Sequence, residues 1–236
     1  MLETQFVKVY DDVFSPDLFK EIMTTYSNIQ DLSEKGFVGS KDKKRVDNEV
    51  KCSWDFNLKS LNKYHYPDGE IPLIKHKNLS KQIEVVQQDL MLEYLSSFNT
   101  LLDETANSLY TNIKKKRHTF FAVQQFQLYL ANEGHFNKFH ADEYVGNTLY
   151  YRNQKSTRLF VFIHYLNDVE EGGETEFLYT DISVKPKKNR CVIFPATWPW
   201  VHKGKIPISS DKLILTTWLS WDDSLTISKL YNNYET

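Results

Sequence analysis

The stretch RLFVFIHYLNDVEEGGETEFL, residues 158–178, decides the fold class of this chain. Its first part, Arg158–Leu166, is dense in β-branched and aromatic residues, a composition that favours a β-strand. The turn Glu171–Glu174 holds two adjacent glycines, and Thr175–Leu178 returns to strand-forming residues. Two strands around a glycine turn indicate a domain built from short strands.

The residues on both sides of this stretch extend the pattern. Further β-rich runs at Phe121–Leu130, Cys191–Phe194 and Lys212–Trp221 are separated by turn residues. The earlier part of the chain is helical in character, because apolar residues recur at helical spacing from Ser80 to Ile113, with a break expected near Ser96–Asn99. Helices first and many short strands afterwards predict an α+β, mainly β fold: a sheet sandwich with helices packed on its outside.

Length and composition are those of one soluble domain. The chain has 236 residues, of which 41% are hydrophobic, a net charge of −2 and two cysteines. We expect a single domain over 1–236, with helical support and a polar lid segment at 1–117, the core at 118–222 and a tail at 223–236. The charge gives no general attraction to nucleic acid or to a membrane surface. There is neither a signal peptide nor a long apolar run, so a cytoplasmic protein is expected. The oligomeric state stays open.

The most informative motif is Phe139–Asp142. In an extended strand, residues two apart point the same way, so His140 and Asp142 could present a nitrogen and a carboxylate oxygen to one metal ion. A distant histidine such as His202 would complete a facial triad that leaves positions open for substrate and O₂. The pairing alone is weak, and His164, in an apolar strand, is better explained as a hydrogen-bonded core histidine.

Lys212 begins the last β-rich run, and Ile214, Thr216 and Trp218 follow it at period two. If Lys212 points inward it needs an anionic partner, because burying an unpaired ammonium is costly. The simpler alternative places it at an exposed strand start beside Asp211. The residues themselves leave both possibilities open.

The order of these motifs resembles the prolyl 4-hydroxylase branch of the 2-oxoglutarate/Fe(II) oxygenases. Over roughly residues 120–221, the resemblance rests on five features in family order. These are the His-X-Asp motif, the strand that ends Tyr165–Asp168 with Glu170–Phe177 after it, Val184–Arg190 leading to Phe194-Pro195, His202, and a basic residue ten positions further on. The family implies a double-stranded β-helix core of the jelly-roll or cupin-like type, with N-terminal supporting helices.

The resemblance also implies residue roles. Iron would be bound by His140, Asp142 and His202, and Lys212 would pair with the distal carboxylate of 2-oxoglutarate. The remaining implied positions are Tyr129, Tyr165 and Thr216 in the co-substrate pocket, with Arg158 and Trp218 beside the substrate channel. The implied enzyme is a dioxygenase that hydroxylates a C–H bond and converts 2-oxoglutarate to succinate and CO₂. Its cofactors would be Fe(II), 2-oxoglutarate and O₂, with ascorbate as a further candidate.

Some positions depart from the family pattern. Asn189 replaces a common turn glycine, although asparagine tolerates a positive φ. Arg158 and Tyr165 are seven residues apart, so they share a face only if a bulge intervenes or Arg158 precedes the strand. We expect a peptidyl proline as substrate, with the segment Gly36–Asp55 folding over it as a lid. The alternatives are a free amino-acid or small-molecule hydroxylase, a nucleic-acid demethylase, and a non-catalytic cupin-like binding module.

Overall fold

The computed structural model describes residues 4–38, 45–59, 73–98, 104–115, 118–143 and 156–222. Its longer helices are α1 (Pro16–Ile29), α2 (Leu73–Ser96) and α3 (Glu104–Lys114), with 3₁₀ turns η1 (Thr4–Phe6) and η2 (Gln30–Leu32). The strands before α2 are β1 (Lys8–Tyr10), β2 (Glu34–Lys35), β3 (Phe37–Val38), β4 (Arg45–Val46), β5 (Lys51–Cys52) and β6 (Trp54–Asn57). Those after α3 are β7 (Thr119–Tyr129), β8 (His135–His140), β9 (Ser156–Tyr165), β10 (Thr175–Phe177), β11 (Ser183–Val184), β12 (Arg190–Pro195), β13 (His202–Gly204) and β14 (Lys212–Asp222).

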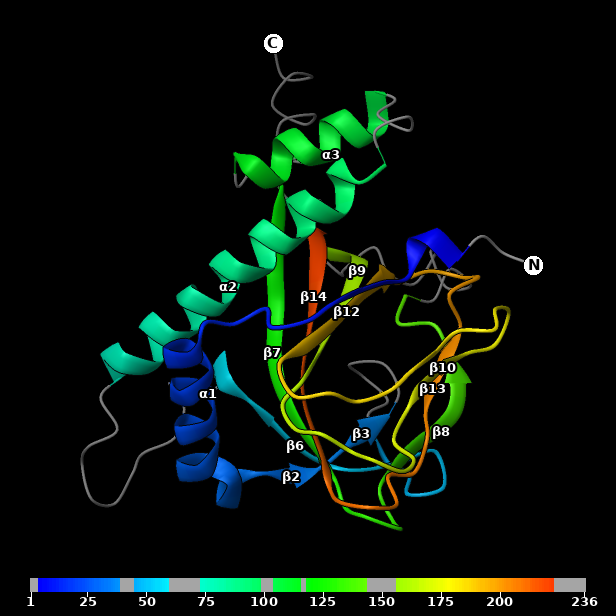
Figure 1. The fold of residues 1–236 in the computed structure, drawn as a ribbon. Helices are drawn as coiled ribbons and strands as arrows, with labels where there is room; N and C mark the ends of the chain where they lie inside the picture. The colour runs from blue at the N-terminus through cyan, green and yellow to red at the C-terminus, as the bar shows by residue number, and fades with distance from the viewer. Residues whose placement is uncertain are drawn as a thin grey trace, which may run out of the picture.

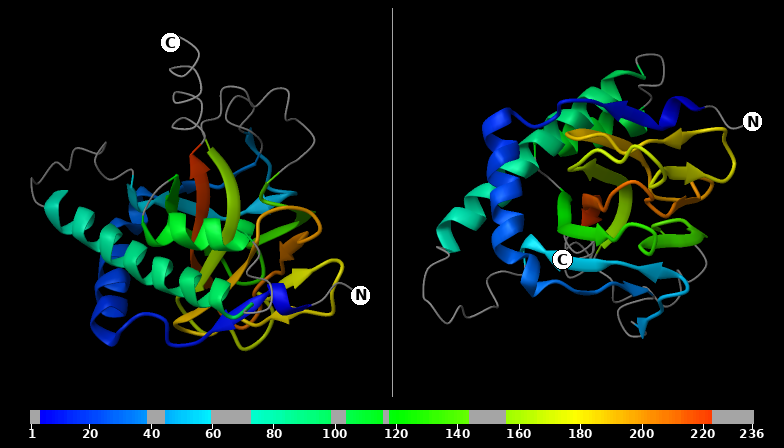
Figure 2. Two further views of the ribbon diagram at one scale, coloured as in Figure 1. Left: turned by 90° about the horizontal axis from the view of Figure 1, so that it is seen from above. Right: turned by 60° about the horizontal axis from the view of Figure 1, so that its bottom comes forward.

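Two antiparallel sheets form the centre of the molecule. The larger has the strand order β1-β12-β9-β14-β7-β6-β2, and the smaller β11-β10-β13-β8-β5. Helices α1 and α2 lie along one side of the larger sheet, and the smaller sheet lies on the other (Figures 1 and 2). The predicted sandwich, mainly β with helices on its outside, is confirmed, and the five β-rich runs all form strands in it.

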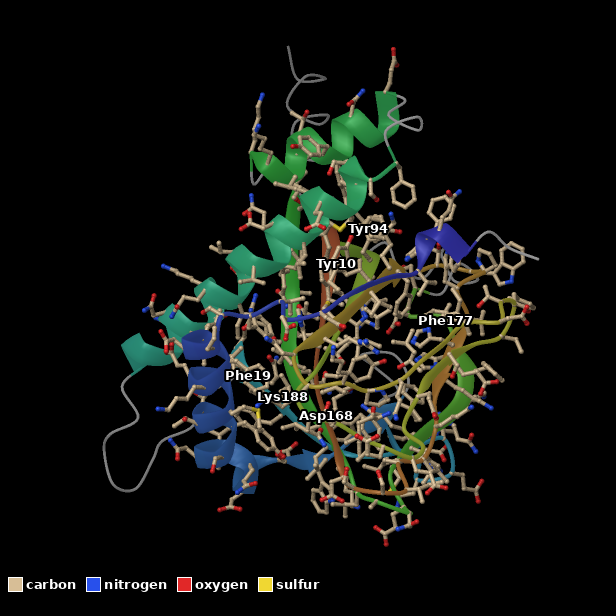
Figure 3. The ribbon with its side chains drawn as sticks, in the orientation of Figure 1. Tyr10, Phe19, Tyr94, Asp168, Phe177 and Lys188 are labelled. Carbon is tan, nitrogen blue, oxygen red and sulfur yellow. The ribbon has the colours of Figure 1, made fainter. Side chains whose placement is uncertain are left out.

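The helices cover the larger sheet through apolar faces that the sequence patterns predict. Helix α1 begins where Ser15 accepts a hydrogen bond from the Leu18 amide at 3.3 Å, with Pro16 as the first helical residue. Helix α2 ends at Ser96, where a break was expected, and Tyr94 on it lies close to Tyr10 of β1 (Figure 3). None of the helices in the described part of the chain is long and apolar enough to cross a membrane.

Alternate side chains of strand β9 point to opposite faces of the larger sheet, and so contribute to two different hydrophobic cores. Phe162 and His164 face the helices, whereas Val161, Ile163 and Tyr165 face the smaller sheet. On the smaller sheet Phe177 contributes to the same inner core (Figure 3). The space between the sheets is therefore lined by the odd-numbered residues of β9, and any group placed there meets a mostly apolar wall.

A bulge near the start of β9 resolves the problem of Arg158. The pairing of β14 with β9 shifts there, because Leu219 lies opposite Phe160 while the adjacent Ser220 lies opposite Arg158. The extra residue reverses the alternation, so Arg158 lies on the same face as Val161 and Tyr165. The bulge that the predicted role of Arg158 required is present. Asn189 likewise has a φ of 62° in the turn before β12.

The polar segment before α2 differs from the expectation. It was expected to be irregular and to fold over the site as a lid, but parts of it are strands of the two sheets. Strand β5 pairs with β8, and β6 pairs with β7. Lys51 and Ser53 are only 4% and 2% exposed, so residues 51–57 are a fixed wall of the sandwich rather than a lid. The short, charged sequence hid these strands because it carries no clear alternation.

Candidate metal centre

Two histidines face each other across the smaller sheet. His140, the last residue of β8, is the direct cross-strand partner of His202, the first residue of β13, and their ring centroids are 4.5 Å apart. Each Nδ1 lies close to a backbone carbonyl two residues earlier, at 2.9 Å from Lys138 O and 3.1 Å from Trp200 O. An Nδ1–H donated to a carbonyl leaves Nε2 as the free lone pair, which is the arrangement of a metal-binding imidazole.

Asp142 completes the group from the bend that follows β8, not from the strand itself. One ligand atom from each of His140, Asp142 and His202 can be chosen so that all three lie within 4.8 Å of one another. Asp142 Oδ2 lies 3.4 Å from His202 Nε2, and it is buried without a hydrogen-bond partner. A buried carboxylate oxygen without a donor, beside two imidazole nitrogens, fits a divalent cation. Two histidines and one carboxylate are the donor set of non-haem Fe(II).

The other oxygen of Asp142, Oδ1, already has a hydrogen-bond donor. Its Oδ1 accepts a hydrogen bond from the Trp218 indole Nε1 at 3.0 Å. The guanidinium of Arg158 stacks 3.9 Å above the Trp218 ring, and its Nη1 donates to the Asp142 carbonyl at 3.2 Å. Arg158 and Trp218, which were predicted to border the substrate, therefore also orient the carboxylate so that Oδ2 alone faces the histidines.

Electrostatics hold these groups in the protonation states that a metal needs. Burial lowers the pKa of His140 to about 4, and the charge of His202 acts in the same direction. Burial alone would raise the pKa of Asp142, but the facing imidazoles and Arg158 outweigh it, so that pKa lies below its usual value. A neutral His140 and an ionised Asp142 need no proton removed before they bind a cation.

A pocket runs from the three ligands to Lys212 between the two sheets. Lys212 is 3% exposed, and its Nζ donates to the Gly173 carbonyl at 2.9 Å and lies 4.7 Å from the centre of the Tyr129 ring. Among the described residues, no carboxylate lies within ion-pair distance of this ammonium. Burial lowers the pKa of Lys212 to about 8, although the charge of Glu174 opposes the shift. Of the two possibilities left by the sequence, Lys212 is the buried one.

The other implied co-substrate residues lie around this end of the pocket. Thr216 and Tyr129 both donate to the side-chain oxygen of Gln127, at 3.2 and 3.3 Å. Tyr165 lies one layer behind the lining, where its hydroxyl shares a 2.7 Å hydrogen bond with Thr175. The sequence reasoning missed Gln127 and Thr175, which line the pocket. The only signal available for Gln127 was its period-two spacing before Tyr129, and Thr175 had none.

His164 shows what a buried histidine without such partners looks like. Its ring is 0% exposed, lies 3.1 Å from the Gln87 side-chain nitrogen and packs against Phe14. No carboxylate shares its surroundings among the described residues. The interpretation of His164 as a hydrogen-bonded core residue agrees with this geometry.

A sequence model of the 2OG-Fe(II) oxygenase superfamily matches residues 124–220, which contain all three ligands and Lys212. The match shows that this segment is similar to the 2OG-Fe(II) oxygenase superfamily. The chain is also similar to the probable prolyl 4-hydroxylase 9 of Arabidopsis thaliana, with 26% identity over 136 residues. That match covers 48% of this chain and 44% of the plant protein, so the chain spans less than half of its relative's length. The predicted resemblance to the prolyl 4-hydroxylase branch is confirmed.

Solved structures of prolyl hydroxylases share the fold of the oxygenase. The viral collagen prolyl hydroxylase of Paramecium bursaria Chlorella virus-1, in a 2OG complex, has a TM-score of 0.57 at 17% identity and covers 93% of this chain and 98% of that one. The Pseudomonas putida prolyl-4-hydroxylase has a TM-score of 0.53 at 16% identity, covering 94% and 95%. A Trichoplax adhaerens prolyl hydroxylase, bound to a hypoxia inducible factor peptide, has 0.57 at 14%, covering 94% and 86%. The expected double-stranded β-helix core with N-terminal supporting helices is confirmed.

Proposed function

We propose that this protein is a 2-oxoglutarate-dependent Fe(II) dioxygenase that hydroxylates a prolyl residue in a peptide. The observation that carries the proposal is a carboxylate oxygen without a donor and an ammonium without a carboxylate in one pocket. Asp142 Oδ2 is a buried anion without a donor, and Lys212 is a buried cation without a carboxylate among the described residues. A metal dication at one end and a dicarboxylate reaching the other would satisfy both.

His140, Asp142 and His202 would hold the iron, and three coordination positions would stay open for the co-substrate and O₂. When bound, iron and 2-oxoglutarate supply the oxidative chemistry: O₂ and 2-oxoglutarate yield succinate and CO₂, and one oxygen atom enters a C–H bond of the substrate. The protein's own contribution is to place, orient and shield these groups.

Lys212 would bind the distal carboxylate of 2-oxoglutarate by exchanging its Gly173 carbonyl partner for a charged one. Thr216 and Tyr129 would flank that carboxylate, and Tyr165 would support the pocket through Thr175. Val161, Ile163 and Ile214 line the pocket between its two polar ends. These apolar side chains exclude water, which strengthens the ammonium–carboxylate attraction.

The peptide substrate is supported by the outward side of the metal centre. The Arg158 side chain is 40% exposed, and its guanidinium has donors beyond the one given to the Asp142 carbonyl. It could therefore bind a peptide carbonyl while the Trp218 ring offers a flat apolar wall to a pyrrolidine. Ascorbate would act as an auxiliary reductant.

Mass spectrometry of proline-containing peptides incubated with the iron-loaded protein, 2-oxoglutarate and O₂ tests this function. We expect one added oxygen atom per turned-over peptide, with an equal amount of succinate, and neither product with Asp142→Ala. Free proline, other free amino acids and methylated oligonucleotides serve as competing substrates. If only a free amino acid is hydroxylated, the proposed peptide substrate is wrong, whereas the proposed oxygenase activity stands. The absence of any 2-oxoglutarate binding or succinate formation would favour the non-catalytic cupin-like module.

A further inference from the structure

The chain crosses from one sheet to the other at Ser53. Strand β5, just before it, belongs to the smaller sheet beside β8, and β6, just after it, belongs to the larger sheet beside β7. Strands β7 and β8 carry opposite walls of the pocket, with Tyr129 on β7 and His140 on β8. Residues 51–57 therefore close the side of the sandwich on which these two walls meet.

A buried ion pair joins the two sheets across this crossing. Lys51 Nζ of β5 lies 2.6 Å from Asp55 Oδ2 of β6, and the two side chains are 4% and 9% exposed. Asp55 also accepts hydrogen bonds from Ser53 Oγ and from Gln125 Nε2 of β7, each at 2.7 Å. We call Lys51, Ser53 and Asp55 the inter-sheet clasp.

The clasp touches both walls of the pocket. On the β8 side, Lys51 is the cross-strand partner of Phe136, whose ring stacks on His140 with centroids 3.8 Å apart. On the β7 side, Asp55 is the cross-strand partner of Gln127, whose side-chain oxygen accepts a hydrogen bond from the Tyr129 hydroxyl at 3.3 Å. The charge of Asp55 also adds to the rise in the pKa of Tyr129 that burial causes. One side of the clasp thus supports a metal ligand, and the other acts on a residue proposed to flank the co-substrate.

We infer that the Lys51–Asp55 pair positions His140 and Tyr129 across the pocket, and so sets the distance between the metal and the co-substrate carboxylate. Buried ion pairs contribute little net stability, and apolar replacements of whole pairs are often neutral or stabilising. Their directional contacts instead fix one arrangement of the groups around them. Lys51 and Asp55 are positioning residues, and this role rests on the proposed function.

A substitution at Gly36 can disturb the clasp without changing a charge. Its amide donates to the Ser53 carbonyl at 2.9 Å. A Cβ atom on residue 36 would overlap the Ser53 hydroxyl, and it would lie 3.1 Å from both Asp55 Oδ2 and Lys51 Cε. Gly36→Ala should therefore displace the clasp while leaving the metal ligands and Lys212 in place.

The test compares Lys51→Met, the neutral pair Lys51→Met/Asp55→Asn, and Gly36→Ala with a control. The control is Lys185→Met/Glu170→Gln, which removes an exposed ion pair whose residues lie outside residues 51–57 and outside β7 and β8. Melting temperature is measured for each variant. Fe(II) and 2-oxoglutarate dissociation constants come from anaerobic titrations that follow the visible absorption of the Fe(II)–2-oxoglutarate complex.

We expect Lys51→Met to weaken both bindings about tenfold, the low end of the effect seen when partners of metal ligands are removed. The neutral pair should regain melting temperature without regaining co-substrate affinity, Gly36→Ala should resemble Lys51→Met, and the control should keep wild-type affinities. If affinity follows melting temperature in every variant, or if Lys51→Met binds like the control, the pair is only structural and the inference is wrong.

Hydrogen exchange separates this inference from the proposed function. If the wild-type protein binds neither iron nor 2-oxoglutarate, the proposed function fails, and exchange decides on the clasp alone. Faster exchange of the β7 and β8 amides in Lys51→Met than in the control supports the clasp. Equal exchange in the two variants contradicts it.

Discussion

The two ends of the pocket have opposite charge deficits. At the metal end, Asp142 Oδ2 is a buried carboxylate oxygen without a hydrogen-bond donor, and two imidazoles face it. Arg158 Nη1 lies 3.6 Å from the other oxygen, Oδ1, so the carboxylate is only partly neutralised. At the other end, Lys212 is a buried cation whose hydrogen bond goes to a neutral carbonyl, that of Gly173. The difference shows what the pocket requires: a dication at one end and an anion at the other. A 2-oxo dicarboxylate that chelates the metal meets both requirements with a single molecule.

Lys51 shows the opposite case on the smaller sheet. It is as buried as Lys212, at 4% against 3%, but it has a carboxylate partner at 2.6 Å. Burial of a charged side chain is therefore no sign of a ligand site by itself. Among the described residues, the sign is a buried charged group left with a carboxylate oxygen that has no donor, as in Asp142, or with an ammonium that has no carboxylate, as in Lys212.

Removing the carboxylate at the metal end of the pocket should have the largest effect on turnover and metal binding. Asp142→Ala takes away the only anionic ligand of a dication, so turnover should fall below detection and metal affinity by at least about 10–100-fold. Titration with Fe(II) or Co(II) measures the affinity, and Glu143→Gln, the adjacent acid, is the control. An Asp142→Ala protein that binds metal and turns over as before would show that the carboxylate is no ligand.

Removing the ammonium at the lysine end of the pocket should weaken the binding of 2-oxoglutarate but not that of the metal. Lys212→Met loses a charge-assisted bond worth about 1.5–3 kcal/mol, which should raise the KM for 2-oxoglutarate by about 10–150-fold. Fe(II) affinity should change little. Lys212→Arg should keep part of the function because its charge persists in a different geometry. If Lys212→Met has an unchanged KM, Lys212 is not the anchor of the distal carboxylate.

The pH dependence of the lysine end should have opposite signs with and without co-substrate. Since the pKa of Lys212 falls from 10.5 to about 8 on folding, the unfolded chain binds more protons between these values. Lys212 therefore makes the ligand-free protein more stable as pH rises through this window. The affinity for 2-oxoglutarate should fall over the same window as the ammonium is lost. Both trends should vanish in Lys212→Met, measured by denaturant unfolding and by titration; a wild-type affinity that stays flat to pH 10 would contradict this.

The smallest effect concerns the carboxylate orientation. Trp218→Phe keeps a ring beneath Arg158 but loses the indole donor to Asp142 Oδ1, at a cost of roughly 1–2 kcal/mol. Metal affinity should drop by about 5–30-fold, the same free energy expressed as a ratio. Trp221→Phe, on the same strand, should leave it unchanged. If the two variants bind the metal equally well, Trp218 does not orient the carboxylate, and its role is in packing or in substrate binding.

The sequence was a good guide to residues 118–222 because the longer strands there are rich in β-branched and aromatic residues. Runs of that composition between turn residues predicted β7, β9, β12 and β14, and the positive φ at Asn189 is one that asparagine tolerates. The three residues predicted as metal ligands lie together, with one ligand atom of each within 4.8 Å of the others. Asp142 was less well placed, since it lies in a bend, and the shared direction of residues in a strand was the wrong reason for a correct pairing.

The clasp could not be predicted. Its three residues are close together in sequence, but they act on strands that come much later in the chain. Lys51 and Asp55 look like ordinary solvated charges in a polar segment, and strands of two to four residues carry too few positions for a pattern. Their burial depends on β7 and β8: Gln125 of β7 comes 70 residues after Asp55, and Phe136 of β8 comes 85 residues after Lys51. Gln127 was missed for a related reason: a glutamine in a strand signals nothing until its neighbours across the sheets are known.

The early strands also decide where the protein can be cut. Strand β6 pairs with the outer side of β7, β5 with that of β8, and β1 with that of β12. A fragment limited to the motif-rich residues 118–222 would lose all three, and unpaired strand edges recruit other chains. We therefore propose that residues 1–117 belong to the same folding unit as the core, and that such a fragment would self-associate rather than remain a smaller working enzyme.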